Sequence, residues 1–362
     1  MSGEKLHVSA PGRICLFGEH QDYLGLSVIT AAIDLRISIY GVIRRDRVLT
    51  LDLPDIGDKI IINLDRPVIY ERERDYFRSV INVLQREGVT IEKGYDCTVR
   101  GNIPINSGTS SSSALIVAWI KFLLTAAGDA RANDALVIAK LAHRAEVLEF
   151  NEPGGMMDHF ACSFGSVLYI DFSTPDAYQQ LPANLGKFVL GDSRQPKDTK
   201  GILKRVKEGA LQALSLLQQQ DPAITIHTIS LAQLDHYRNL LTGPQYDVLY
   251  ANVINRDLVQ QAKTELLSKK FDPHKLGELL NRHQDELRER SQISTPKIDG
   301  MIDAALQAGA LGAKINGSGG GGCMFAYAPD KYEQVAESIE RAGGKAFIVE
   351  IGRGACEDDN SV

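Results

Sequence analysis

The sequence lacks the features of a secreted or membrane protein. Its five cysteines are an odd number and none forms a Cys-x-x-Cys pair, so neither a disulfide framework nor a zinc site is indicated. Residues 1–13 contain no apolar core like that of a signal peptide. The most apolar stretch, 114–127, is too short to span a bilayer and contains Lys121. We therefore expect a cytoplasmic protein without a membrane partner.

The sequence also lacks an excess of basic residues. Forty Lys plus Arg stand against 46 Asp plus Glu, which gives a net charge of −6. A general nucleic-acid binder would show a surplus of positive charge on the surface that contacts the phosphate backbone. We therefore expect no nucleic-acid partner.

What is present is the composition of an ordinary globular protein with a small excess of glycine. The 362 residues are 44% hydrophobic and 24% charged, and chains of this length usually form two domains. The 32 glycines are roughly seven more than an average content of about 7% would give. Much of this glycine lies in a few short segments that also carry polar residues.

Hydrophobic periodicity predicts a mixture of strands and helices. Alternation with a period of two indicates strands, and apolar positions three and four apart indicate helices. The segment 110–127 is apolar nearly all round and predicts a buried helix. The remaining predicted strands are 33–40, 49–53, 95–99, 167–172, 187–190, 323–328 and 346–351, and the remaining predicted helices are 77–84, 133–152, three or four within 199–291, and 331–342.

The first polar segment, 10–23, places a cation, two carboxylates, an imidazole and a phenol between strand-like patterns. Ile14, Leu16 and Phe17 are apolar, so part of the segment is expected to be buried. Charged groups beside a core need partners or a ligand. The alternative is a solvated turn.

The second segment, 101–113, is rich in glycine and serine and leads directly into the predicted buried helix. Small residues let backbone N–H groups converge at a helix N-terminus, which favours a phosphate group. The segment is not a Walker A loop, because GxxxxGK[ST] is absent. The alternative is that the serines only cap the helix.

The third segment, 314–323, contains five glycines in six positions and is followed by an apolar stretch. Such a run indicates backbone packed closely against another group. A flexible hairpin turn is the alternative. A dinucleotide-binding fingerprint is disfavoured, because that motif is followed by a helix rather than a strand.

Together, these segments resemble the three signature motifs of the GHMP kinases, in the same order and at similar spacing, from residue 8 to about 328. The first motif, and the stretch 145–158, resemble galactokinases in particular, and 75–77 resembles the segment near the nucleotide base. Cys15, Asn106 and Ser107 depart from the galactokinase pattern. The four consecutive glycines of the third motif, and the stretch 192–203, are closer to mevalonate kinases.

The resemblance implies an α+β fold of two domains with the active site between them. The N-terminal domain, 1–180, would hold the first two motifs and the catalytic aspartate. The C-terminal domain, 181–362, would be ferredoxin-like and bring the third motif over the phosphate site.

The resemblance further implies ATP and Mg²⁺ as cofactors. Ser112 and Glu146 are the implied magnesium ligands, and Ser111 or Ser113 could take the place of Ser112. One carboxylate and a hydroxyl suit Mg²⁺, which keeps several of its waters. The implied ATP-binding residues are Ser107, Gly108, Thr109, Ser110, Ser111, Ser112, Gly319 and Gly320.

Asp158 is the implied acceptor of the substrate hydroxyl proton, with Arg13 beside it to stabilise charge on the transferred phosphoryl group. The sequence leaves open whether Asp158 is a base or only orients the hydroxyl. The implied substrate-binding residues are Glu19, His20, Asp22, Tyr23 and Gly155, although Tyr23 could equally be a packing residue.

The resulting hypothesis is an ATP-dependent kinase that phosphorylates the anomeric hydroxyl of a galactose-like monosaccharide. The nearest alternatives are a GHMP kinase for arabinose, a uronic acid, an N-acetylhexosamine or mevalonate. A catalytically silent sensor of sugar and ATP is a further alternative, disfavoured by the presence of Arg13, Glu146 and Asp158. The oligomeric state is left open.

Overall fold

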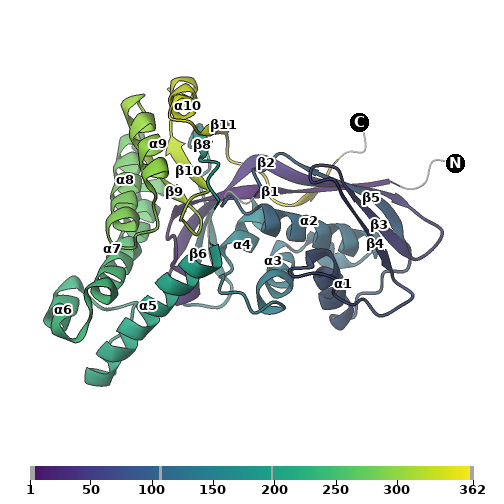
Figure 1. The fold of residues 1–362 in the computed structure, drawn as a ribbon, viewed down its shortest axis with the longest axis horizontal. Helices are drawn as coiled ribbons and strands as arrows, with labels where there is room; N and C mark the ends of the chain where they lie inside the picture. The colour runs from purple at the N-terminus through teal and green to yellow at the C-terminus, as the bar shows by residue number, and fades with distance from the viewer. Residues whose placement is uncertain (1–4, 106–107, 197–198, 359–362) are drawn as a thin grey trace.

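The computed structural model describes residues 5–105, 108–196 and 199–358 of the chain. Ser107, predicted to bind ATP, lies outside these residues. The fold contains two sheets, each with helices packed against it, as Figure 1 shows. Mixed helices and strands in two layers confirm the α+β class predicted from the sequence.

The larger sheet is formed mainly by the first part of the chain. Its strands follow the order β12-β1-β2-β5-β3-β4, and β6 and β7 extend it from β2. The pairing of β1 with β2 is irregular between Pro11 and Arg13 and between Cys15 and Phe17. The strands are β1 Lys5–Phe17, β2 Val28–Ile43, β3 Val48–Leu53, β4 Asp58–Asn63, β5 Tyr95–Gly101, β6 Val167–Asp171, β7 Ala177–Leu181 and β12 Cys356–Glu357.

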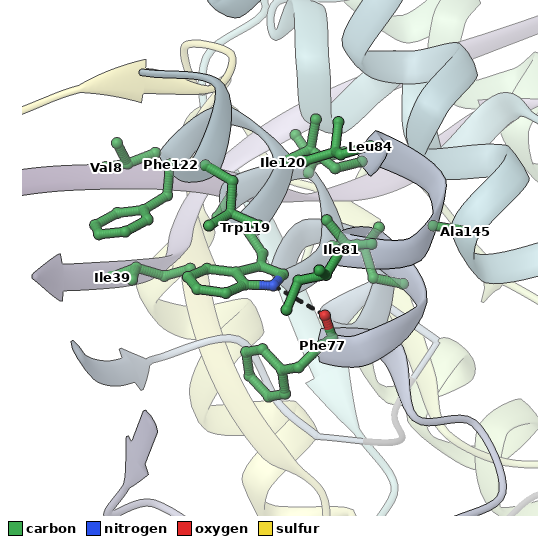
Figure 2. Close-up of a cluster of buried hydrophobic side chains, with 14 of the residues drawn as sticks. Val8, Ile39, Phe77, Ile81, Leu84, Trp119, Ile120, Phe122 and Ala145 are labelled. Atoms are coloured by element: carbon green, nitrogen blue, oxygen red, sulfur yellow. Dashed lines mark hydrogen bonds between the residues drawn. The ribbon is translucent and has the colours of Figure 1, made fainter. Parts of the chain in front are cut away.

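Helices α1–α4 lie together on one side of β1 and β2 (Figure 1). In the hydrophobic core between them, Trp119 is 1% exposed. Its indole N–H donates to the carbonyl of Phe77 at 3.2 Å, and its ring stacks on Phe122 (Figure 2). The helices are α1 Tyr76–Arg86, α2 Ser111–Ala126, α3 Ala135–His143 and α4 Met157–Phe164, with short 3-10 turns at Asp22–Leu24 and Ala130–Asn133.

The predicted helix over 133–152 is shorter and irregular in the structure. It begins after Asp134, whose carboxylate caps the N–H groups of Leu136 and Val137, and changes into a π-helix, Arg144–Leu148, before Pro153. Tighter or looser turns of this kind occur often at functional sites. The Glu146 side chain projects from this π-helical turn.

The smaller sheet has the antiparallel order β11-β8-β10-β9. One face packs on α9 and α10, and the other shares a core with β1, β2, α7 and α8. Its strands are β8 Phe188–Asp192, β9 Gly312–Asn316, β10 Cys323–Tyr327 and β11 Lys345–Val349, and the helices of this half are α5 Thr199–Gln220, α6 Leu231–His236, a 3-10 turn Arg238–Leu240, α7 Gly243–Leu266, α8 Pro273–Glu289, α9 Pro296–Gln307 and α10 Tyr332–Arg341.

The end of the chain returns to the larger sheet. Strand β12 pairs with β1, and Arg36 of β2 donates to the carbonyls of Arg353 and Gly354 at 2.7 and 2.8 Å. The tail therefore crosses from the smaller sheet to the strand that carries the first motif. The boundary between two domains near residue 180, which the sequence predicts, stays a prediction.

Candidate active site

A cleft with a cavity volume of about 210 Å³ lies where the three polar segments meet. Its wall is formed by the end of β1, the start of α2, the π-helix, the loop before α4, and the third glycine segment. Twelve of the residues predicted to form the site line it: Arg13, Glu19, His20, Asp22, Tyr23, Gly108, Ser110, Ser111, Ser112, Glu146, Gly155 and Asp158.

Arg13 and Asp158 form an ion pair in the cleft. The Arg13 Nε donates to Asp158 Oδ1 at 2.7 Å, and its Nη1 donates to the carbonyl of Gly108. The Arg13 side chain is 4% exposed, whereas Asp158 is 30% exposed, so the carboxylate faces the cleft. Burial is the largest influence and alone would raise the pKa of Asp158, but the Arg13 charge, the charge of His159 and hydrogen bonds to the carboxylate together hold that pKa below its ordinary value.

Glu146 is held by two neighbouring side chains. Its Oε2 accepts from the Ser113 hydroxyl at 2.7 Å and from His159 Nε2 at 2.9 Å. Burial acts to raise the pKa of Glu146, but these polar partners outweigh it and lower the pKa. An ionised carboxylate beside hydroxyl groups is a donor set that fits Mg²⁺ completed by phosphate oxygens and water. No group of three or more His, Cys, Asp or Glu residues suited to a metal occurs within 5–105, 108–196 and 199–358.

Asp22 lines the same cleft as Asp158 and begins the 3-10 turn that follows β1. Its Oδ2 accepts from the Met157 N–H at 3.2 Å, and its Oδ1 accepts from the Tyr23 N–H at 2.9 Å. Burial, and then the charge of Asp158, raises the pKa of Asp22 to about 6. Gly155 touches this carboxylate so closely that a Cβ there would lie 2.0 Å from Oδ2.

Glu19 and His20 join the first motif to the third. Glu19 is 2% exposed, and its oxygens accept from Lys314 Nζ at 2.6 Å and from the Gly317 N–H at 2.5 Å. His20 contacts the Tyr23 hydroxyl at 2.8 Å and the carbonyl of Ser318 at 3.0 Å. Burial lowers the pKa of His20 to about 4, so its ring is neutral at pH 7.

The second motif meets the cleft at the N-terminus of α2. Ser110 is the residue before the first turn and has a left-handed φ of 59°, and Ser111 and Ser112 begin the helix. The unpaired N–H groups and the helix dipole favour an anion at this end. Thr109 is fully buried and does not line the cleft, although its carbonyl accepts from the Arg13 N–H at 3.2 Å.

Gly319 and Gly320 also lie away from the cleft wall. Both have positive φ, and the Gly320 N–H donates to the carbonyl of Ile293 at 2.7 Å. A Cβ on Gly319 would meet Ile293, and one on Gly320 would meet Ile202. Gly317 and Ser318 are the residues of the third segment that line the cleft.

Two buried residues of β9 were missed by the sequence reasoning. Lys314 is fully buried, and its ammonium contacts Glu19 and the carbonyls of Cys15 and Ile315. The Asn316 amide accepts from the Cys15 N–H at 2.9 Å and donates to the carbonyl of Gly108 at 2.8 Å. The available signal was a lysine and an asparagine within the short stretch 312–316, just before the glycine run.

A second hollow, with a cavity volume of about 310 Å³, adjoins the first. Its walls are mostly apolar, with Ile37, Leu53 and Phe77 among them. The two hollows share Arg74, Tyr76, Ser111 and Ser112, so they form one continuous surface beside the N-terminus of α2.

Three family models match separate parts of the chain. The model described as the GHMP kinases N terminal domain matches residues 75–166, and the GHMP kinases C terminal model matches 263–348. The galactokinase galactose-binding signature matches 2–42, which includes the first motif. The chain belongs to the GHMP kinase superfamily.

The relatives of this GHMP kinase include both sugar and mevalonate kinases. A galactokinase of Staphylococcus saprophyticus is 29% identical over 95% of the chain and 90% of its own length. A mevalonate kinase of Thermococcus gammatolerans is 28% identical over 95% of the chain and 96% of its length. The fold is similar to that of Lactococcus lactis galactokinase complexed with galactose, with a TM-score of 0.86 and 24% identity over 99% of the chain and 96% of that structure.

None of the helices described, over 5–105, 108–196 and 199–358, is long and apolar enough to cross a bilayer.

Proposed function

We propose that this protein is an ATP-dependent kinase that transfers a phosphoryl group to the anomeric hydroxyl of galactose or a galactose-like sugar. The observation that carries the proposal is the galactose-binding signature over 2–42, in which Arg13 pairs with Asp158 and Asp22 lines the same cleft. The similarity of the fold to that of a galactokinase complexed with galactose also supports a galactose-like acceptor.

The proposed reaction places the sugar between Asp22 and Asp158. The attacking hydroxyl oxygen forms a bond to the γ-phosphorus as the bond to the β–γ bridging oxygen breaks, which releases ADP. Arg13 stabilises the negative charge on the phosphoryl group during transfer. Because the pKa of Asp158 is low, its carboxylate orients the hydroxyl and accepts the proton only as the oxygen loses electron density to phosphorus.

Asp22, His20, Tyr23 and the Gly155 backbone are proposed to contact the sugar, with Glu19 bordering the same space. A buried site with matched hydrogen-bond partners discriminates against analogues that lack a hydroxyl, because its polar groups would be left unpaired. The neutral His20 ring suits contact with a hydroxyl rather than with an anion.

The nucleotide is proposed to lie along the two joined hollows. The apolar second hollow suits the base, and the N-terminus of α2 suits the phosphates. Ser112 and Glu146 are proposed to hold Mg²⁺, with Ser113 supporting the carboxylate. When bound, Mg²⁺ would neutralise charge on the phosphate oxygens.

A mevalonate kinase activity is the second candidate. It is favoured by the four consecutive glycines of the third segment and by the mevalonate kinase of T. gammatolerans at 28% identity.

A coupled assay of ADP formation tests the proposal. The acceptors are galactose, arabinose, a uronic acid, an N-acetylhexosamine and mevalonate, each with ATP and Mg²⁺. We expect the highest kcat/KM for galactose or a close relative, lost in Asp158→Asn while the thermal melting temperature is retained. ATP binding with no ADP formation on any acceptor would reject the kinase proposal, and mevalonate as the preferred acceptor would favour the second candidate.

A further inference from the structure

Arg74 lies at the passage between the two hollows. Four residues line both of them, namely Arg74, Tyr76, Ser111 and Ser112, and Arg74 is the cation among these four. A nucleotide whose base lies in the apolar hollow has to run its phosphates through this passage to reach Asp158. No sequence motif singled out Arg74.

Two hydrogen bonds to Glu152, from the loop before α4, hold the Arg74 guanidinium in a fixed orientation. Arg74 Nε donates to Glu152 Oε1 and Nη2 donates to Oε2, each at 2.9 Å. The Arg74 side chain is 38% exposed and Glu152 is 11% exposed. This two-point pairing uses one edge of the planar guanidinium and leaves the Nη1 hydrogens without an acceptor among the residues that the structure describes.

The backbone beneath Arg74 is held in an unfavourable conformation. Its φ is 56°, in the left-handed region that non-glycine residues rarely adopt. The next residue, Asp75, is 1% exposed, pairs with Arg78 at 3.0 Å and accepts from the Glu71 N–H at 3.1 Å. Strained residues that are held by surrounding bonds cluster at active sites and ligand clamps.

We propose that Arg74 is a further nucleotide-binding residue, which donates from Nη1 to a phosphate of ATP while Glu152 keeps its other edge in place. A guanidinium can hold a carboxylate on one edge and a phosphate on the other, because its donors lie in one plane. The ion pair with Glu152 therefore stays intact when the nucleotide binds. The inference rests on the proposed function, since it takes ATP as the ligand.

The test compares Arg74→Gln with Arg86→Gln. Arg86, at the end of α1, pairs with Glu149 of the same segment as Glu152, but lines neither hollow, so its substitution makes the same charge change nearby. Binding of the non-hydrolysable ATP analogue AMP-PNP with Mg²⁺ is measured by calorimetry, and adenosine binding is measured by competition.

We expect Arg74→Gln to weaken AMP-PNP binding roughly 10- to 150-fold, the range for loss of a hydrogen bond to a charged group. Adenosine binding and the KM for the acceptor should be unchanged, and Arg86→Gln should bind AMP-PNP like the wild type. Unchanged AMP-PNP binding in Arg74→Gln, or an equal loss for adenosine, would overturn the inference. A wild-type protein that binds AMP-PNP but forms no ADP with any acceptor would instead refute the proposed function.

Discussion

Gly155→Ala is predicted to damage acceptor binding by displacing Asp22. A Cβ at position 155 would lie 2.0 Å from Oδ2 of Asp22 and 2.3 Å from its Cγ. Ordinary van der Waals contacts of a Cβ begin at 3.4 Å, so the carboxylate would have to withdraw by more than an ångström. Its bonds from the Met157 and Tyr23 N–H groups, at 3.2 and 2.9 Å, would then be lost.

Gly155→Ala is expected to impair use of the acceptor sugar without weakening the binding of ATP. A misplacement of about 1 Å in a group that positions the substrate costs on the order of 100-fold in rate. We therefore expect kcat/KM for the acceptor sugar to fall by roughly 100-fold, with the KM for ATP little changed. The measurement is initial-rate kinetics with each substrate varied in turn, alongside a thermal melt that confirms folding.

Gly154→Ala is the matched control for this variant. A Cβ at position 154 would meet Val147 Cγ2 at 3.5 Å, which is an ordinary van der Waals contact. The control adds the same methyl group one residue away and should lose little activity. If Gly155→Ala uses the sugar as well as Gly154→Ala does, Asp22 is not a sugar-binding group in the position described.

Four further predictions follow from the charged groups of the site. Because the pKa of Asp22 is raised to about 6, the KM for the sugar should fall as the pH rises through 6, and Asp22→Asn should remove this dependence. Because the pKa of Asp22 is raised, the folded protein holds this proton more tightly than the unfolded chain does. The folded state should therefore lose stability as the pH rises from 3.8, the ordinary pKa of an aspartate, to about 6. The measurement is the difference in melting temperature between the wild type and Asp22→Asn across this pH range. Glu146→Gln should raise the Mg²⁺ concentration for half-maximal activity by at least about tenfold in a magnesium titration, and no change would place the metal elsewhere. Lys314→Met should lower the free energy of unfolding by about 3–5 kcal/mol, because it leaves the buried Glu19 charge without its ammonium partner. The double variant with Glu19→Gln should regain most of this loss in thermal melts.

The residues that meet around Asp158 could be predicted because they belong to motifs that match those of a known family. Arg13, Asp22 and Asp158 stand in the cleft as the first motif and the stretch 145–158 implied. The carboxylate partner of Arg13 lies 145 residues away, so its pairing came from family resemblance rather than from local pattern. The direction and size of the pKa shifts could not be predicted, because they depend on burial, and burial cannot be inferred from the spacing of residues in the sequence.

The contacts across the chain could not be predicted. Lys314 reaches Glu19 over 295 residues, and Arg74 reaches Glu152 over 78. Such pairs depend on how distant parts of the chain pack together. None of these four residues belongs to a periodic pattern in the sequence. The sequence showed the buried helix α2 well, since a run apolar on all sides has no solvent-facing alternative.

Parts of the fold were missed for local reasons. Strand β4 has the alternating residues Ile60 and Ile62 on its buried face, but Ile61 between them is also apolar and hides the period of two. The helix α9 begins at Pro296 behind the cap Thr295, a start signal that was overlooked. The π-helix at 144–148 has no signature that a period of 3.6 residues could detect.

The position of Trp119 gives this protein a spectroscopic reporter confined to one half of the fold. Trp119 is the chain's only tryptophan, and it lies in the core between the larger sheet and α1 and α2. Its fluorescence will therefore follow the melting of that layer alone, whereas circular dichroism will also register the long helices α5, α7 and α8 of the other half. Disagreement between the two signals during heating would reveal that the halves unfold separately.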